Sequence, residues 1–186
     1  MWHGGVVGTE EHPNIRRARF EALVRDVLVE PLRRFLRRRT DPETADDVLS
    51  DTLLACWRRF DELPDPPLPW AYGVARLCLA NAQRSARRQQ RLAARVAAVD
   101  PPREADDAPA DDALHEALGS LDPDDAELLR LWAWEQLTPS EIATVLGVTP
   151  NAASIRLHRA RGRLRDAIGK VEAGAGHEGV EGGRRG

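Results

Sequence analysis

The sequence predicts an all-α protein made of two small helical domains joined by an acidic, flexible linker. Apolar residues recur at helical spacing on both sides of residue 100, and two closely spaced helix-start signals stand near the C-terminal end. Residues 100–127 carry eleven acidic side chains and one basic one, whereas the segments on either side have a basic excess. We therefore expect a disordered N-terminus at 1–14, a first domain at 15–98, a linker at 99–112, a second domain at 113–169 and a disordered tail at 170–186.

Two antiparallel helices should open the first domain. The first runs from Phe20, and Pro31 should kink or divide it because proline cannot donate a backbone hydrogen bond. Asp41-Pro42 is a helix-start signal for the second helix. Its outer side should be acidic, through Asp46, Asp47 and Asp51. The expected apolar stripes consist of Phe20, Leu23, Val24, Val27, Leu28, Leu32, Phe35 and Leu36 in the first helix, and Ala45, Val48, Leu49, Thr52, Leu53, Cys56, Trp57 and Phe60 in the second.

A proline-rich loop and a long third helix should complete the first domain. Asp61 to Pro69 contains four prolines, so this segment should be a loop of restricted shape. The third helix should begin near Trp70 and reach Arg95. Its first half is apolar enough to lie centrally in the bundle, and its second half is basic, with Arg84, Arg87, Arg88, Arg91 and Arg95.

The second domain should hold four helices. A short helix begins at about Ala113, and Asp122-Pro123 should cap the next one. Trp132 and Trp134 on that helix are expected in the hydrophobic core. After them, Thr138-Pro139 with Glu141 has the pattern of a capping box, Gly147 should end the helix, and Thr149-Pro150 repeats the start signal at once. Two helices separated by so short a turn indicate a helix-turn-helix.

The last helix has two distinct faces. Ala153, Leu157, Ala160, Leu164 and Ile168 form an apolar stripe that should pack on Ile142, Val145 and Leu146. Short polar side chains followed by arginines suit the major groove, where the former can reach base edges and the latter can hold phosphates. The alternative is an amphipathic helix with a solvated basic face. The outer face consists of Asn151, Ser154, Ile155, His158 and Arg159, with Arg156, Arg161, Arg163 and Arg165 around it.

The remaining composition favours a cytoplasmic protein without membrane insertion. No apolar run approaches the length of a membrane span, and residues 1–9 lack the layout of a signal peptide. Cys56 and Cys78 lie within helical patterns and have no metal-site spacing, so we expect two buried thiols in a reducing compartment, with a disulfide as the alternative.

With these motifs in place, the chain resembles a bacterial RNA polymerase sigma factor of the extracytoplasmic-function group within the sigma-70 family. The second half carries Glu141-Ile142-Ala143, Leu146-Gly147, Arg156-Leu157 and Arg159-Ala160-Arg161, which follow that family's domain four. The first half carries Ala45-Asp46-Asp47-Val48 with Trp57 downstream, and the segment Trp70 to Arg76 followed by Arg84, which follow domain two. The chain departs from many relatives at Ser50, where they have glutamine, and at Leu77, where they have asparagine.

The resemblance implies partners and roles. Domain two would dock on the beta-prime clamp helices of core RNA polymerase and open and read the minus-ten element, while domain four would approach the beta flap and read the minus-thirty-five element. An anti-sigma factor is a further candidate partner. No enzymatic activity, catalytic residue, metal or cofactor is implied. The implied contacts are Asn151, Ser154, Ile155, Arg156, His158, Arg159 and Arg161 for minus thirty-five; Trp70, Arg76, Asn81, Arg84, Arg87 and Arg88 for minus ten; and Asp46, Asp47, Ser50 and Asp51 for polymerase.

Two other functional classes stay open on the sequence. A DNA-binding regulator that acts without polymerase would use the first domain to dimerise or sense a ligand, and would bind a two-fold site. A metal-dependent nuclease could use Asp46, Asp47 and Asp51, since carboxylates four residues apart share a helix face. However, no further carboxylate or histidine cluster and no glycine-rich phosphate loop accompanies them.

Overall fold

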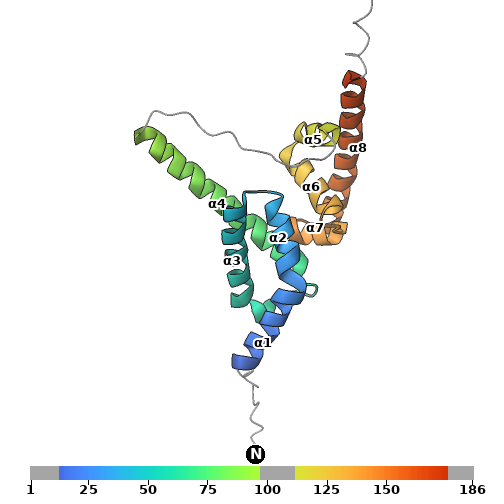
Figure 1. The fold of residues 1–186 in the computed structure, drawn as a ribbon. Coiled ribbons are helices and arrows are strands. Elements are labelled where there is room, and N and C mark those ends of the chain that lie inside the picture. Colours follow the sequence, from blue (N-terminus) through green and yellow to red (C-terminus); the bar gives the residue numbers. More distant parts are fainter. Residues whose placement is uncertain (1–12, 97–111, 176–186) are drawn as a thin grey trace, which may run out of the picture. The chain divides into compact units, whose positions relative to one another are not determined.

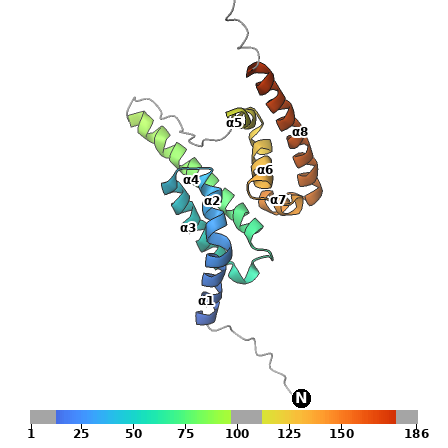
Figure 2. The same ribbon diagram turned by 45° about the vertical axis from the view of Figure 1, so that its right-hand side comes forward.

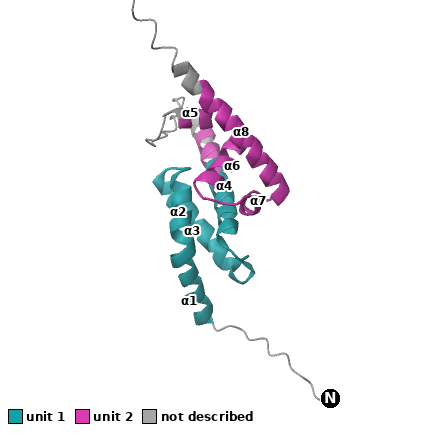
Figure 3. Cartoon of the chain, turned by 90° about the vertical axis from the view of Figure 1, so that its right-hand side faces the viewer, with its two compact units in different colours: residues 1–84 teal, residues 85–186 magenta. Residues whose placement is uncertain are grey.

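A computed structural model of the protein describes residues 13–96 and 112–175, and every regular element among these residues is a helix. The chain divides into two compact units, residues 1–84 and residues 85–186 (Figure 3). The predicted all-α fold class is therefore confirmed. The predicted linker at 99–112 lies outside the described residues except for Asp112, and so do most of the predicted N-terminal and C-terminal tails.

The first helical segment of unit 1 is interrupted, as Pro31 predicted. Helix α1 (Pro13–Leu23) passes into a π-helical turn, η1 (Val24–Leu28), and then into α2 (Val29–Arg37). The Val29 N–H donates to the Val24 carbonyl, which is a π-type bond across five residues. Pro31 has no N–H to offer the Val27 carbonyl, so the regular ladder cannot continue through this point. Helix α1 begins before the predicted start at Phe20.

Helix α3 (Pro42–Arg58) lies antiparallel to α2, as predicted (Figure 1). Asp41 caps it: the Thr44 N–H donates to Asp41 Oδ1 at 2.9 Å, and this backbone hydrogen bond lowers the pKa of the carboxyl. The predicted inner stripe is buried at its central positions, whereas Leu53 and Trp57 are half-buried. The buried members are Ala45, Val48, Leu49, Thr52 and Cys56.

The connection to the next helix is shorter than predicted. A 3-10 turn, η2 (Phe60–Glu62), follows α3, and α4 (Leu68–Val96) begins at Leu68 rather than near Trp70. The predicted loop, Asp61 to Pro69, was therefore wrong at both ends, because its first two residues belong to η2 and its last two to α4. Proline is tolerated in the first turn of a helix because its missing N–H would have no intrahelical partner there. Within the loop, the Asp65-Pro66 peptide bond is cis.

Helix α4 closes the core of unit 1 with one face. Ala71, Tyr72, Ala75 and Leu79 are buried, and the Tyr72 ring lies 5.0 Å from that of Phe35 on α2. No helix among the described residues combines the length and apolar character that a membrane span requires, although α4 itself is long enough.

Both cysteines are free thiols. Cys56 is fully buried, as predicted, and burial raises its pKa to about 11. Cys78 is only half-buried, and burial also raises its pKa. Because the thiolate is the reactive form, burial makes both side chains less reactive than an exposed cysteine.

Unit 2 is built around its last helix. α5 (Asp112–Gly119), α6 (Pro123–Ala133) and α7 (Pro139–Leu146) all contact α8 (Pro150–Ala175), as Figure 2 shows. Asp122 caps α6 by accepting the Asp124 N–H at 2.9 Å. The largest buried side chains of this unit include Leu128, Leu131 and Ile142.

The expectation that Trp132 and Trp134 lie in the core was wrong. Their exposed fractions are 38% and 41%. The inward positions of α6 are taken by Leu128 and Leu131, which are three residues apart on one side of the helix. The Trp132 ring instead lies under the guanidinium of Arg161, at 4.5 Å from the ring centroid.

Candidate nucleic-acid interface

Local hydrogen bonds fix the helix-turn-helix at α7 and α8. Thr138 Oγ1 accepts the Glu141 N–H at 3.3 Å, and Glu141 Oε2 accepts both the Thr138 N–H at 2.8 Å and its hydroxyl at 2.7 Å. This is the capping box that the sequence predicted. At the other end of α7, Gly147 is left-handed with φ +65°, and the Val148 N–H donates to the Ala143 carbonyl at 3.0 Å.

The turn between α7 and α8 is short, because α7 ends at Leu146 and α8 begins at Pro150. Thr149 Oγ1 accepts the Ala152 N–H at 3.2 Å, so a second cap starts α8 at Pro150. Ala153, Leu157 and Ala160 of α8 are buried, together with Ile142 and Val145 of α7. The two helices therefore pack through the predicted stripe, and the orientation of α8 in its unit is set by both the turn and this packing.

The opposite face of α8 is open to solvent. Arg156 and Arg159 form no ion pair or side-chain hydrogen bond within the described part of the chain, so both guanidinium groups keep their donors for another molecule. Ile155 is an exposed apolar side chain on this polar face. The exposed predicted residues are Asn151, Ser154, Ile155, Arg156, His158, Arg159 and Arg161.

Two arginines further along α8 are already engaged inside the unit. Arg161 lies over Trp132, and Arg163 donates to the buried carboxylate of Asp125 on α6, 38 residues away in the chain. The sequence placed them around the same basic face as Arg159. The structure distinguishes Arg161 and Arg163 from Arg159, because of these three side chains only the first two hold α8 against α6 within the described residues.

One side of α4 gathers the residues expected at the minus-ten element. At 100° per residue, the six positions from Trp70 to Arg88 fall within about 140° of the helix circumference. Asn81, Arg84, Arg87 and Arg88 are exposed, whereas Trp70 and Arg76 are half-buried. Arg84 Nε donates to the Ala80 carbonyl at 3.2 Å, and its terminal nitrogen donates to Asn81. Leu77 is exposed on the same side.

An acidic face lies on α3. Asp46, Asp47, Ser50 and Asp51 are all exposed, and Ser50 Oγ donates to the Asp46 carbonyl at 3.0 Å. Leu54, one turn further, adds an exposed apolar side chain that the sequence analysis did not single out. Within residues 13–96 and 112–175, no group of three or more His, Cys, Asp or Glu side chains is arranged to hold a metal ion.

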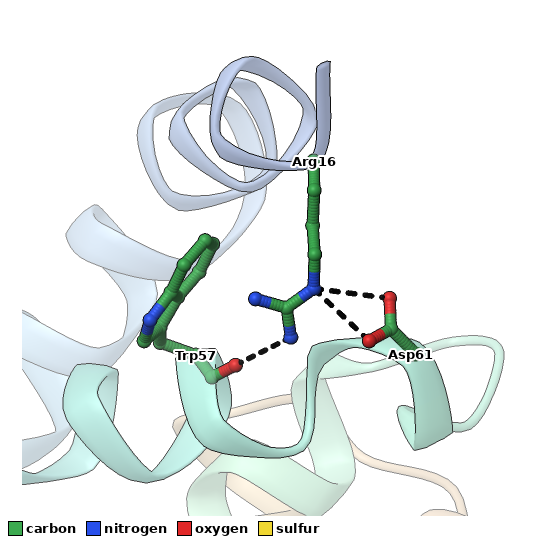
Figure 4. Close-up of polar contacts among 3 residues, drawn as sticks. All are labelled: Arg16, Trp57 and Asp61. Atoms are coloured by element: carbon green, nitrogen blue, oxygen red, sulfur yellow. Dashed lines mark hydrogen bonds and ion pairs between the residues drawn. The ribbon is translucent and has the colours of Figure 1, made fainter. Parts of the chain in front are cut away.

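Two arginines that the sequence analysis missed lie at the junction of α3, η2 and α4. Arg16 of α1 donates to Asp61 and to the Trp57 carbonyl (Figure 4). Arg59 donates to Glu62 and lies over the Trp70 ring. Neither forms part of a motif, and Arg16 and Asp61 are 45 residues apart, so periodicity could not have paired them.

Comparison with known proteins covers both units. The family model described as Sigma-70 region 2 matches residues 23–91, and the one described as Sigma-70, region 4 matches residues 111–164. The chain is 33% identical to RNA polymerase sigma factor CarQ of Myxococcus xanthus over 137 residues, which is 69% of this chain and 76% of that protein. It is 30% identical to an RNA polymerase sigma-E factor of Streptomyces coelicolor over 156 residues, which is 80% of this chain and 85% of the relative.

A solved structure supports the fold. The sigma factor RpoE from Bartonella quintana, crystallised in complex with the anti-sigma factor NepR, gives a TM-score of 0.55 at 20% identity. The match covers 82% of this chain and 97% of that one.

Proposed function

The chain belongs to the sigma-70 family of RNA polymerase sigma factors and is an alternative sigma factor of the extracytoplasmic-function group, and from this premise we propose which residues bind promoter DNA and which bind core polymerase. The observation that carries the assignment is that one chain contains both sigma regions, in order. Each matches a folded segment that presents a charged, exposed helix face. We propose that these segments act as domains at 15–98 and 113–169.

The exposed face of α8 reads the minus-thirty-five element in the major groove. Its first turns carry Asn151 and Ser154, whose short polar side chains suit base edges, and His158 follows one turn later. Arg156 and Arg159 supply positive charge and can pair with guanine or phosphate. Their lack of internal partners within the described residues supports this role, because binding DNA breaks no existing contact.

The α4 face holds the minus-ten element in its opened form. Unstacking a base costs a few kcal/mol, and a protein can favour the open state only by binding it better than the duplex. Exposed Arg84, Arg87 and Arg88 can hold the phosphates of a single strand, and half-buried Trp70 offers an aromatic surface at the start of the same helix.

The acidic face of α3 docks on core polymerase. Asp46, Asp47, Ser50 and Asp51 would meet the beta-prime clamp helices, and exposed Leu54 provides an apolar contact between the charges. Unit 2 would approach the beta flap. These assignments rest on the family resemblance together with the exposure of the side chains.

The other expectations also belong to this proposal. The protein acts in the cytoplasm, where polymerase and promoter DNA are found, and it is not an enzyme and needs no cofactor. An anti-sigma factor would regulate it, and the acidic linker at 99–112 would run through the polymerase interior.

The first experiment is co-elution of the full chain with bacterial core polymerase, followed by run-off transcription from the DNA upstream of its own gene. We expect a one-to-one complex and transcripts that depend on the chain. If the chain instead binds the same DNA as a dimer and does not associate with polymerase, it is a DNA-binding regulator that acts without polymerase.

A charge-reversal pair tests the polymerase face. Asp47→Lys with Asp51→Lys should weaken the complex with core polymerase, since a polar, screened interface is sensitive to the sign of its charges. The double variant Glu21→Lys with Asp26→Lys makes the same change of net charge on α1 and η1, and should leave the complex intact. Equal effects of the two pairs would place the interface elsewhere.

A further inference from the structure

An aliphatic side chain lies at the centre of the polar face of α8. Ile155 is 45% exposed. The residues that hold α8 in its unit are Ala153, Leu157 and Ala160, and α5, α6 and α7 all lie on one side of the helix (Figure 2). At 100° per residue, Ile155 lies about 140–160° around the helix from each of these three residues. The packing of unit 2 therefore does not explain this isoleucine.

Polar and charged residues surround Ile155 on the exposed face. Asn151 and Arg159 lie one turn before it and one turn after it, each within about 40° around the helix. His158 is also exposed, about 60° to one side. Arg159 has no ion pair or side-chain hydrogen bond within the described residues. Ile155 is thus a single apolar contact within a face whose other members suit base edges and phosphates.

The side chain of Ile155 is also preorganised. A β-branched residue in a helix has one strongly preferred χ1 rotamer, so Ile155 loses little conformational freedom when another molecule covers it. Isoleucine is a poorer helix former than alanine, and its exposed position here offers little burial in return. Both facts indicate that the apolar surface of this side chain is used in a contact with another molecule.

We propose that Ile155 reads a thymine of the minus-thirty-five element through the C5-methyl group of that base. In the major groove, thymine presents a methyl group, whereas the edges of the other bases present hydrogen-bond donors and acceptors. An apolar side chain at the centre of a recognition face therefore has one complementary partner on duplex DNA. The inference rests on the proposed function and adds the identity of one base to it.

The neighbouring side chains limit where this thymine lies. Residues four apart rise about 6 Å along a helix, and base pairs are stacked about 3.4 Å apart. Asn151 and Arg159 therefore reach base pairs within about two steps of the one that Ile155 contacts. In the major groove, asparagine pairs with adenine and arginine with guanine. We expect the thymine, on either strand, next to positions that are read by hydrogen bonds.

The test uses holoenzyme reconstituted with the full chain and the promoter fragment from upstream of its own gene. Thymines on both strands of the minus-thirty-five element are replaced one at a time by deoxyuridine, which lacks only the methyl group. With the wild-type chain, we expect one position at which this change weakens binding about fourfold, the effect of one buried methyl group. Ile155→Ala should bind the unmodified promoter about four- to tenfold more weakly and show no further loss at that position.

The same substitution at another exposed isoleucine is the matched control. Ile15 of α1 is 55% exposed and lies outside the recognition helix. Ile15→Ala should bind the promoter as wild type does, with the full loss at the deoxyuridine position. Because both isoleucines are exposed, neither variant should shift the thermal unfolding midpoint of the chain appreciably.

A second variant separates the methyl contact from a merely steric role. Ile155→Gln keeps a side chain that extends from the same face, but its end is an amide that donates and accepts hydrogen bonds. We expect this variant to lose the deoxyuridine effect as Ile155→Ala does. Ile155→Val keeps the branched apolar side chain and should retain part of the effect. A full deoxyuridine effect in Ile155→Gln would overturn the methyl contact.

The outcomes distinguish this inference from the function on which it rests. A wild-type chain that forms no holoenzyme, or a holoenzyme that does not require the minus-thirty-five element, would refute the proposed function. A holoenzyme that requires the element but shows no deoxyuridine effect, or the same effect with Ile155→Ala as with wild type, would refute only the thymine contact. Weaker binding of Ile155→Ala to core polymerase, with DNA binding unchanged, would place the isoleucine against protein and would also refute the thymine contact.

Discussion

The two helices that we assign to promoter DNA, α8 and α4, present their residues in different ways. On α8, Arg156 and Arg159 extend to solvent without a partner among the described residues. On α4, Arg84 donates to a carbonyl of its own helix, and the Arg59 guanidinium, which donates to Glu62, lies over the Trp70 ring. The first surface is unoccupied and the second is already connected to its own unit.

This difference fits the two states of DNA that a sigma factor meets. A duplex groove has a defined shape before binding, so a helix with the right orientation and available side chains is enough. An opened strand has no shape of its own, and the protein must supply one from groups held in place. On α8 the turn and the packing set the orientation of the helix, whereas on α4 contacts also hold individual side chains, as with Arg84 and Trp70.

The largest expected effect tests the free face of α8. Arg159→Ala should weaken binding of the holoenzyme to a duplex minus-thirty-five element by about 1–3 kcal/mol, and should leave stability unchanged within about 0.5 kcal/mol. Fluorescence anisotropy and thermal unfolding measure the two quantities. Arg165→Ala, which removes an exposed arginine six residues further along the same helix that is not among the assigned contacts, is the matched control. A loss of stability with Arg159→Ala would mean that the side chain is structural, and the contrast between the helices would fail.

The next effect tests whether local signals build α7 and α8. Thr138→Val removes the hydroxyl of the capping box and should destabilise unit 2 by about 1 kcal/mol. Hydrogen exchange followed by mass spectrometry should show faster exchange in α7 and α8, with unit 1 unaffected. Thr144→Val removes a hydroxyl whose only hydrogen bond among the described residues is a long one, donated to the Ser140 carbonyl at 3.4 Å, and should have little effect. Similar results for the two variants would contradict the role of the cap.

A smaller effect separates the two kinds of arginine on α8. Arg161→Met should lower the stability of unit 2 by about 0.5–1 kcal/mol, because the methionine loses the cation–π contact with Trp132. Arg159→Met should not. Urea unfolding followed by the fluorescence of the tryptophans compares the two variants directly. Equal midpoints would show that the Trp132 contact contributes nothing.

The smallest effect concerns the helix cap in unit 1. The Thr44 N–H lowers the pKa of Asp41 below its ordinary value of 3.8, so the ionised cap adds stability above that value and loses it as the pH falls through the lowered pKa. Asp41→Asn keeps a capping side chain without a titrating proton. Its acid unfolding curve, measured by circular dichroism below about pH 4, should therefore be flatter than that of wild type. Identical curves would show that this carboxyl does not contribute to acid sensitivity.

Much of the fold could be predicted because the information is local. Caps, glycine turns and apolar spacing depend on residues that are close in the sequence. They predicted α3, α7 and α8 with their buried faces, and they predicted where α6 begins. The same rules located the break near Pro31. The resemblance to sigma factors then supplied the candidate site residues, most of which are exposed on one side of their helix.

The rest depends on contacts between distant segments. Trp132 looks like a core residue by composition, and only the position of α8 shows that it faces Arg161 instead. Arg16 and Arg59 are two of many arginines in the chain, and the residues next to them in the sequence do not distinguish them from the others. They become distinct only when α1, η2 and α4 come together in three dimensions.

The π-helical turn at Val24–Leu28 holds one residue more than a regular α-helical turn would. Deletion of one residue inside the turn would bring the Val24 carbonyl and the Val29 N–H to the four-residue spacing of an α-helix, so α1 would keep its orientation relative to α2. Deletion of one residue in the regular part of α1, between Arg16 and Val24, would instead rotate Arg16 by about 100° and shift it by about 1.5 Å, away from Asp61 and Trp57. The N-terminal helix is therefore tolerant of a single-codon deletion at the turn and sensitive to one just before it.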